Sequence, residues 1–455
     1  MFRYGFLFIQ SLTILYIIDN FATLKKWAMT KLKKALNNLR TTILTFLFLI
    51  NYSITHAEEI KQYSASSDST LIVYLNENNI QATGHNKVKL LKSGHEKFID
   101  LFQQIETAKH HIHLEYFNFR NDSIANALFK LLEKKAKEGV KIRAIYDAFG
   151  NSSNNQPLKR KHIKAIQEKG IEIVKFDPIR FPWINHVFHR DHRKIVVIDG
   201  AIGYTGGMNI ADYYIHGLPE IGEWRDMHVK IEGEAVSNLQ DIFLKMWNDC
   251  TKQDIHGDEY FPYRNGSCFA PEQNKEIAIV DRCPKKTNKI MRRVYAKAIE
   301  SAENKVQIIN PYFTPTKIIT KAIKKAMKKG VSVEIMIPGK SDIKFTPDAA
   351  FYKANQLRKK GADIHIFNGG FHHSKIMMID SLYCTVGSTN LNSRSLRYDY
   401  EVNAFIFDRE TTNELINIFE EDKKNSTLLT SEIYKEQTVW KKFVGWFAHL
   451  FTPFL

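Results

Sequence analysis

The sequence contains little cysteine. Four of its 455 residues are cysteines, and no two of them form a C-x-x-C pair. This argues against a disulfide framework and against a structural zinc site as the basis of the fold. A single bridge stays open if the domain is exported, because Cys250, Cys268 and Cys283 lie close together in the sequence.

Acidic residues are outnumbered. The chain has 65 Lys and Arg against 49 Asp and Glu, which gives a formal net charge of +16. With 44% hydrophobic and 25% charged residues, the composition is that of a globular protein and argues against a disordered or collagen-like chain. The basic excess indicates an anionic partner, such as nucleic acid, an anionic membrane or a phosphorylated substrate, with solubility alone as the plain alternative.

Long uninterrupted apolar runs are also missing. Two shorter stretches, residues 4–23 and 41–57, open the chain and flank a basic connector without acidic residues. Each is close to the lower limit of about 17 residues for a membrane-spanning helix. Three interpretations compete: a two-helix membrane hairpin, a signal peptide that begins at Met29 and is cleaved before Glu58, and a pair of buried core helices. Under the first two, the rest of the chain would face outward.

The C-terminal residues 440–455 are rich in aromatic side chains and carry Lys441 and Lys442. The segment is too short to span a membrane. This composition favours either an amphipathic helix that lies on a membrane surface or a helix that packs on the preceding domain.

The chain contains an internal duplication. The segment from Ile105 to Phe117 resembles the segment from Ile299 to Phe313, and each reads as the end of a helix followed by an apolar strand. In both halves, Lys-rich helices that end at glycine then lead into further strands. This alternation predicts an α/β fold with two tandem domains, each a mixed, mostly parallel sheet flanked by helices.

The expected organisation has six parts. They are an N-terminal membrane anchor or signal region at residues 1–60, a linker at 61–85, a first domain at 86–253, an irregular connector at 254–284, a second domain at 285–430 and an amphipathic tail at 431–455.

The same constellation follows a late strand of each half, with identical internal spacing. The two copies are His192, Lys194, Asp199 and Asn209, and His373, Lys375, Asp380 and Asn390. Histidine and lysine two residues apart on a strand point to one face. A Gly-rich turn before each asparagine lets the backbone approach a ligand closely.

Each copy offers an imidazole, an ammonium and an amide, which form a phosphate-binding set that includes a nucleophile. If the two copies meet in one pocket, one histidine could attack phosphorus while the other protonates the leaving oxygen. Two lysines and two asparagines would stabilise the charged oxygens. This chemistry needs no metal ion or cofactor. The neighbouring Arg and Lys disfavour a metal site at His186, His189 and His192.

The paired HxKxxxxD and GxxN motifs resemble those of the phospholipase D superfamily. The stretches 190–200, 206–213, 224–228 and 310–313, with Arg394-Ser395, are similar to its bacterial cardiolipin synthase branch. The resemblance covers about residue 85 to the C-terminus. It implies two phospholipase D-like domains that form a pseudo-twofold pair, with the N-terminal apolar segments as an anchor in the bacterial cell membrane.

The resemblance also implies a reaction through a phosphohistidine. One histidine would take the phosphatidyl group from phosphatidylglycerol and release glycerol, and a second phosphatidylglycerol would then attack to give cardiolipin. We assign His192 as the nucleophile and His373 as the acid/base, and the reverse assignment stays open. Lys194, Lys375, Asn209 and Asn390 would hold phosphate oxygens.

Acidic residues would support these basic groups. Asp199 and Asp380 would orient and tune the His–Lys pairs. Glu223 and Glu401, which lie 14 and 11 residues after their asparagines, would fix a histidine tautomer or else form surface ion pairs. The chain departs from the family pattern at Gly207, where the second copy has Ser388, and at Asn392 and Asp399.

Three other functions use the same residues differently. A phospholipase D would let water attack the phosphohistidine, a nuclease of the superfamily would use the basic charge to bind DNA, and a lipid-binding protein would have inactive motifs. The apolar segments and intact motifs favour the transferase, with an anionic phospholipid and a membrane surface as partners and no nucleic acid. The membrane side of the domains and the oligomeric state are not predicted.

Overall fold

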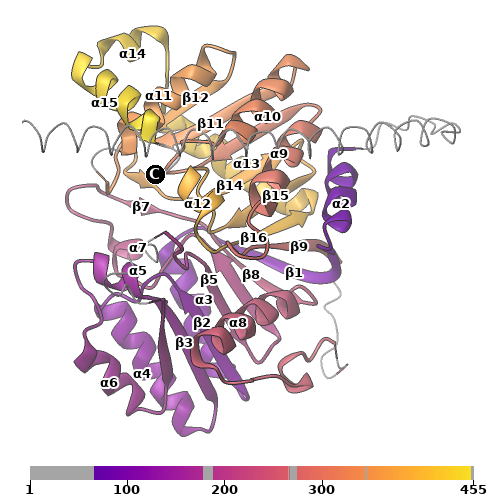
Figure 1. Ribbon diagram of the computed structural model, residues 1–455, viewed down its shortest axis with the longest axis vertical. Coiled ribbons are helices and arrows are strands. Elements are labelled where there is room, and N and C mark those ends of the chain that lie inside the picture. Colours follow the sequence, from indigo (N-terminus) through magenta and orange to yellow (C-terminus); the bar gives the residue numbers. More distant parts are fainter. Residues whose placement is uncertain (1–65, 178–187, 265, 267–273, 344–345, 452–455) are drawn as a thin grey trace, which may run out of the picture. The chain divides into compact units, whose positions relative to one another are not determined.

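One sheet of 15 strands runs through both halves of the chain in the computed structural model (Figure 1). The structure describes residues 66–177, 188–264, 266, 274–343 and 346–451. The two N-terminal apolar stretches expected to anchor or export the protein lie outside these residues. Residue 65 onward forms one compact unit.

The strand order is symmetric about the centre of the sheet. From the centre outward, the first half contributes β1 (Thr83–Leu91), β8 (His228–Gly233), β6 (Ile202–Gly206), β5 (Lys194–Ile198), β2 (His111–Tyr116), β3 (Lys141–Asp147) and β4 (Glu172–Phe176). The second half contributes β9 (Lys275–Arg282), β16 (Glu401–Phe407), β15 (Tyr383–Gly387), β14 (Ile376–Ile379), β10 (Lys305–Ile309), β11 (Ser332–Pro338), β12 (Asp363–Phe367) and β17 (Ser426–Leu428). This order confirms the repeat inferred from the sequence.

The prediction of a mostly parallel sheet was wrong. Neighbours run parallel only within β2–β3–β4 and within β10–β11–β12, and the other described neighbours in this sheet are antiparallel. The reason is that the motif strands β5 and β14 return through tight hairpins rather than through helices. Left-handed backbone at Asp199 and Gly200, and at Asp380 and Ser381, closes these hairpins.

The expected connector, 254–284, is not wholly irregular, because it contains β9. This strand pairs antiparallel with β1 and with β16, and so joins the two halves edge to edge. The expected linker, 61–85, likewise contains a helix and the start of β1. The described cysteines Cys250, Cys283 and Cys384 are free thiols, and Cys268 lies outside the described residues.

Helices cover both faces of the sheet. They are α2 (Ser67–Glu77), α3 (Gly94–Thr107), α4 (Ser123–Lys137), α5 (Ala148–Ser153), α6 (Arg160–Gln167), α7 (Tyr213–His216), α8 (Val236–Thr251), α9 (Ile290–Ser301), α10 (Lys317–Lys328), α11 (Thr346–Arg358), α12 (Ser393–Arg397), α13 (Arg409–Lys424), α14 (Ser431–Glu436) and α15 (Val439–Phe451). Among the described residues, no helix is both long and apolar enough to cross a membrane.

The motif strands are buried on both sides. Val196 and Ile198 of β5 pack in the core under α3 and α4, while Ile195 and Val197 pack in a second core with α8. The side chains of β14 alternate in the same way. One set packs in a core with α9 to α11, and the other packs in the core that also contains Ile195, Val197 and α8, together with α13. Continuous apolar sequence in these strands follows from this double burial. It holds the adjacent His–Lys segments rigidly.

Candidate active site

The two motif histidines lie just before β5 and β14 and are held by backbone pairing between the halves. The His192 N–H donates to the carbonyl of Tyr400 at 3.0 Å, and the His373 N–H donates to the carbonyl of Arg225 at 2.7 Å. A short parallel pair, β7 (Trp224–Arg225) and β13 (Phe371–His372), continues the second of these contacts. Each histidine is thus fixed to a segment of the other half.

Each histidine also takes its carboxylate partner from the other half. His192 Nδ1 lies 3.1 Å from Glu401 Oε1, and His373 Nδ1 lies 2.6 Å from Asp226 Oδ2. Both carboxylates are fully buried. Such a carboxylate fixes the ring orientation and favours a proton on Nδ1, which leaves Nε2 to face a substrate.

Strand register identifies Asp226 as the counterpart of Glu401. Gly206 pairs with His228 in the first half, and Gly387 pairs with Asn403 in the second, so the carboxylates stand two residues before equivalent positions. Of the two glutamates considered for this role, the structure places Glu401 beside His192 and the side chain of Glu223 at the surface. Glu223 is exposed, and the hydrogen bond that it makes across the halves uses its backbone carbonyl, which accepts from the Phe371 N–H.

The difference between Gly207 and Ser388 follows from these carboxylates. A Cβ atom at position 207 would lie 2.2 Å from Asp226 Oδ1, so only glycine leaves room for this shorter acid. In the second half, the Ser388 hydroxyl donates to Glu401 Oε2. Each turn is therefore matched to its own carboxylate.

Both motif lysines are buried beside the histidines. Lys194 Nζ donates to the His192 carbonyl at 2.6 Å, and Lys375 Nζ lies 2.9 Å from His373 Nε2. Burial lowers the pKa of Lys194 to about 7 against the attraction of Glu401, and lowers that of Lys375 to about 8 against the attraction of Asp226. Two ammonium groups near their titration points form a receptor for the negative charge of a phosphodiester.

The two histidines differ in their electrostatic surroundings. Burial, Lys194 and the nearby Lys375 and His373 hold the pKa of His192 well below its usual value. Burial also raises the pKa of Glu401 to about 7. Burial would raise the pKa of Asp226 as well, but Lys375 and His373 outweigh it and leave that pKa below the ordinary value. The carboxylate beside His373 is therefore the more fully ionised of the two.

The motif asparagines are buried, and their amide oxygens have no hydrogen-bond partner among the described residues. A buried side chain forms a hydrogen bond with the backbone of each asparagine loop. Lys97 Nζ, fully buried, donates to the carbonyl of Asn209 at 3.0 Å, and Asn310 Oδ1 accepts from the Leu391 N–H at 3.0 Å. Lys97 was not predicted from the sequence, because a lone lysine in an amphipathic helix does not indicate that it holds a distant backbone carbonyl.

Asp199 and Asp380 do not orient the His–Lys pairs, which corrects the prediction. They lie at the far ends of β5 and β14, because four residues of extended strand separate each of them from its lysine. Asp199 accepts from the N–H groups of residues 109, 110 and 111, and Asp380 accepts from those of residues 303, 304 and 305. Both carboxylates tie a hairpin to the start of the neighbouring strand.

Replacement of Asp199 by alanine should therefore reduce stability rather than chemistry. The loss of three N–H acceptors is expected to lower the free energy of unfolding by about 1–3 kcal/mol. Urea denaturation measures this change, and kcat per folded molecule should stay within about twofold of the wild type. Asp380→Ala is the matched variant with the same expectation. A large fall in kcat without a change in stability would restore their predicted role in orienting the His–Lys pairs.

An aromatic wall surrounds His373. The rings of Trp224, Phe371 and Tyr312 have centroids 5.4, 5.3 and 5.9 Å from the imidazole. The Tyr312 hydroxyl donates to Asp342 Oδ1 at 2.6 Å. This wall limits the access of water to one side of the site.

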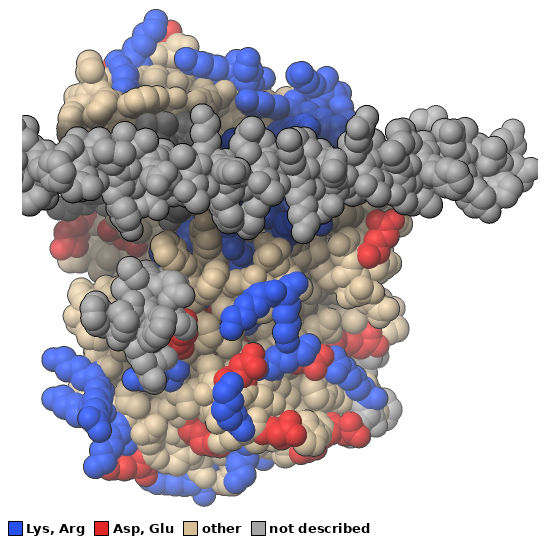
Figure 2. All heavy atoms as spheres, in the orientation of Figure 1, with Lys and Arg blue, Asp and Glu red and all other residues tan. Residues whose placement is uncertain are grey.

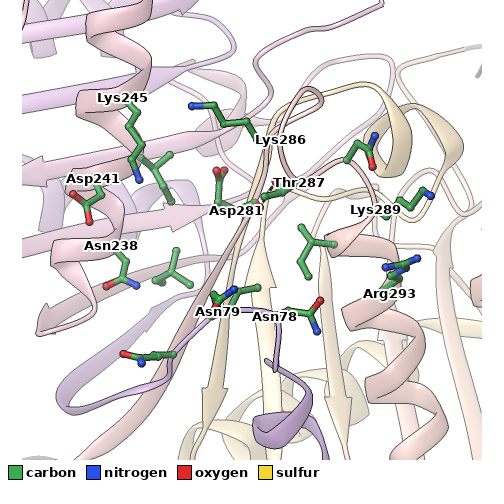
Figure 3. A pocket seen from close by; sticks show the side chains of 16 residues that line it. Asn78, Asn79, Asn238, Asp241, Lys245, Asp281, Lys286, Thr287, Lys289 and Arg293 are labelled. Carbon is green, nitrogen blue, oxygen red and sulfur yellow. Dashed lines mark hydrogen bonds between the residues drawn. The ribbon is translucent and has the colours of Figure 1, made fainter. Parts of the chain in front are cut away.

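A hollow of about 640 Å³ lies by the junction of the two halves (Figure 3). It contains none of the motif residues. Figure 3 shows Asp281 between Lys245 and Lys286 on one side and Lys289 and Arg293 on the other. Asp281 accepts from the guanidinium of Arg193. Within the described ranges, no group of three or more His, Cys, Asp or Glu residues could hold a metal ion.

Comparison with known proteins decides the family. A family model described as "Cardiolipin synthase, PLD-like domain" matches residues 101–247 and 295–423. The chain belongs to this phospholipase D-like cardiolipin synthase family. Each matched segment contains one complete motif from histidine to asparagine, so the resemblance inferred from the motifs is confirmed.

Relatives in the cardiolipin synthase family match over most of their length. The chain is 34% identical to "Cardiolipin synthase 1" of Bacillus anthracis over 379 residues, which cover 82% of this chain and 74% of that protein. It is 36% identical to "Cardiolipin synthase" of Listeria monocytogenes serotype 4a (strain HCC23) over 376 residues, which cover 82% and 76%.

The fold of this family member is also found in a solved structure. The crystal structure of a phosphatidylserine synthase from Haemophilus influenzae Rd KW20 superimposes with a TM-score of 0.65, at 15% identity, over 85% of this chain and 100% of that chain. At this identity, the likeness shows the fold alone.

Proposed function

We propose that this protein is a phosphatidyltransferase that makes cardiolipin and glycerol from two molecules of phosphatidylglycerol. The observation that supports this most is the pair of His–Lys–Asn sets at a buried site, each histidine oriented by a carboxylate of the other half. Relatives named cardiolipin synthases, at 34–36% identity, support the choice of substrates.

In the proposed first step, His192 Nε2 attacks the phosphorus of one phosphatidylglycerol. A phosphorus–nitrogen bond forms, and the bond from phosphorus to the glycerol oxygen breaks as the imidazolium of His373 gives that oxygen its proton. In the second step, His373 takes the proton of a hydroxyl on another phosphatidylglycerol, whose oxygen attacks phosphorus and frees His192. The proton that leaves with glycerol is thus replaced on His373 by the proton of the attacking hydroxyl.

The electrostatics support this division of roles. A nucleophilic imidazole must be neutral, and His192 has the strongly lowered pKa that keeps it so. Burial and Lys375 lower the pKa of His373 too, but the ionised Asp226 beside it opposes them and stabilises the imidazolium that a general acid needs. Lys194, Lys375 and the two asparagines would hold the non-bridging oxygens as charge develops.

We further propose that the enzyme works at the bacterial cell membrane. Both substrates and the main product are phospholipids that reside in the bilayer. The apolar stretches 4–23 and 41–57 support an N-terminal anchor, as a hairpin or as an exported leader. The basic net charge would favour contact with anionic lipids.

The decisive experiment supplies phosphatidylglycerol alone. Purified full-length protein in detergent is incubated with this lipid without added metal, and the lipids and the aqueous products are analysed by mass spectrometry. Cardiolipin with an equal amount of glycerol is expected. Phosphatidic acid without cardiolipin would show that water attacks the phosphohistidine and that the protein is a phospholipase D.

Activity should fall as the pH rises above about 7 to 8, since both lysines lose their protons there. The charged forms of the lysines exist below these pKa values, and the imidazolium of His373, whose pKa is lowered by burial and Lys375, is lost at lower pH still. Log kcat/KM should therefore fall with a slope near about −3 above pH 8. Lys375→Arg keeps one charge and should reduce the slope to about −2. Lys87→Arg, at an exposed position, should retain the wild-type profile. An unchanged slope in Lys375→Arg would contradict the assignment.

A further inference from the structure

The C-terminal helix α15 exposes a row of aromatic side chains. Trp440 is 70% exposed, and Phe443, Trp446 and Phe447 are 44–48% exposed. Their spacing of three and four residues places them on one side of the helix. The ring of Phe443 lies 5.8, 5.9 and 6.0 Å from those of Trp440, Trp446 and Phe447. Single exposed apolar residues are ordinary, but a continuous aromatic row marks an interaction surface.

The opposite side of α15 is fixed to the protein. Gly445 is buried against α11, where a Cβ atom would lie 2.5 Å from the carbonyl oxygen of Asp348. Lys442 Nζ donates to the carbonyl of Lys435 at 2.7 Å. The helix is therefore a docked element that presents its aromatic row outward.

Exposed basic residues lie on α10, close to α11. Lys317, Lys321 and Lys324 are exposed on α10, and none of the three forms an ion pair within the described part of the chain. Lys317 and Lys324 lie near Lys353 of α11, whose pKa burial and these two charges lower to about 8. Figure 2 shows Lys and Arg gathered at the end of the molecule that carries α10, α11 and α15.

The helix on which α15 packs follows a segment that borders the active site. Tyr312, in the wall around His373, donates to Asp342, and the next residue, Ile343, is 47% exposed. The chain then enters α11, whose first turn contains Asp348, the residue against which Gly445 packs. Helix α15 therefore packs on the element that follows the segment bordering the substrate site, and its aromatic row faces away from this contact.

We propose that α15 docks on an anionic phospholipid bilayer, with its aromatic row at the level of the lipid headgroups and the neighbouring lysines on the lipid phosphates. Aromatic rings with a basic flank are the composition of a helix that lies in a membrane interface. The purpose of this docking rests on the proposed function: it would hold the substrate site close to the bilayer that contains the substrates. Binding itself does not depend on catalysis.

The test compares two triple variants of the full chain reconstituted in phosphatidylglycerol vesicles. Trp440→Ser, Phe443→Ser and Phe447→Ser are combined in one. The control combines Val73→Ser, Ile99→Ser and Leu428→Ser, which replace equally exposed apolar residues elsewhere. Thermal unfolding should be the same for both, because the side chains replaced are exposed.

Two activities are measured for each variant. Against long-chain phosphatidylglycerol in vesicles, the α15 variant should lose at least about tenfold in kcat/KM, while the control keeps wild-type values. Against dihexanoyl phosphatidylglycerol dissolved below its micellar concentration, both should match the wild type. Wild-type activity of the α15 variant on both substrates would overturn the proposal. Inactivity of the wild type on both substrates would overturn the proposed function instead.

A second readout does not depend on activity. Phosphatidylglycerol brominated near the headgroup should quench part of the tryptophan fluorescence of the wild type. The double variant Trp440→Phe/Trp446→Phe should lack this quenched part. The quenched part should also be smaller in phosphatidylcholine vesicles. Identical quenching in the wild type and this variant would contradict docking on the bilayer. A change from dimer to monomer in the triple variant, with unchanged quenching, would assign the surface to a second copy of the chain.

Discussion

His192→Ala is expected to lower phosphatidyl transfer by at least about a thousandfold, because it removes the imidazole that is proposed to accept the phosphatidyl group. His373→Ala should reduce turnover of phosphatidylglycerol comparably, since the glycerol oxygen then leaves without a proton. The measurement is the initial rate of cardiolipin formation. His256→Ala, which changes an exposed histidine, should have wild-type activity.

An activated substrate separates the two roles. A phosphatidyl ester of p-nitrophenol has a leaving group that needs no general acid. His373→Ala should therefore release about one equivalent of p-nitrophenol per enzyme in a burst, whereas His192→Ala should release none. A burst in His192→Ala alone would reverse the assignment, and a burst in neither variant would exclude a phosphohistidine on these residues.

Asp226→Asn should have the second largest effect. The ionised carboxylate holds the proton on His373 Nδ1 and stabilises the imidazolium, so its loss should lower kcat by about 10² to 10⁴. Glu401→Gln should cost at most about tenfold at pH 7, because burial already keeps much of Glu401 neutral and a glutamine oxygen can still accept from His192.

Glu223→Gln is the matched control for both substitutions, and its kcat should be that of the wild type. Similar losses in Asp226→Asn and Glu401→Gln would show that the two histidines are electrostatically equivalent. A large loss in Glu223→Gln would mean that this exposed side chain reaches the site during turnover.

The sequence predicts the groups whose positions depend on local backbone. His192 and Lys194 share a face because they stand two apart beside a strand, and the second copy repeats this. The carboxylates depend on pairing between distant segments, and their spacing is unequal: Asp226 lies 17 residues after Asn209, and Glu401 lies 11 after Asn390. A glutamate at similar spacing after each asparagine therefore indicates Glu401 but not Asp226.

The fold was predictable to the same extent. Helices with glycine ends and apolar strands gave the repeated plan, but the direction of β6 and β15 depends on the tight turns at Asp199 and Asp380. The pattern at Lys275–Arg282 was obscured by the neighbouring Gly, Pro and Cys residues, so the strand that joins the halves was taken as irregular. The direction of these strands and the presence of β9 depend on pairing between distant segments, which local sequence does not predict.

The crosswise carboxylates also constrain how such a chain can change over generations. A substitution near Asp226 acts on the histidine of the second half, and one near Glu401 acts on that of the first. Neither half can therefore change its acid without an effect on the histidine of the other half. A chimaera that takes one half from a relative would combine a histidine with a foreign acid, so the halves are inherited, and must be engineered, as one unit.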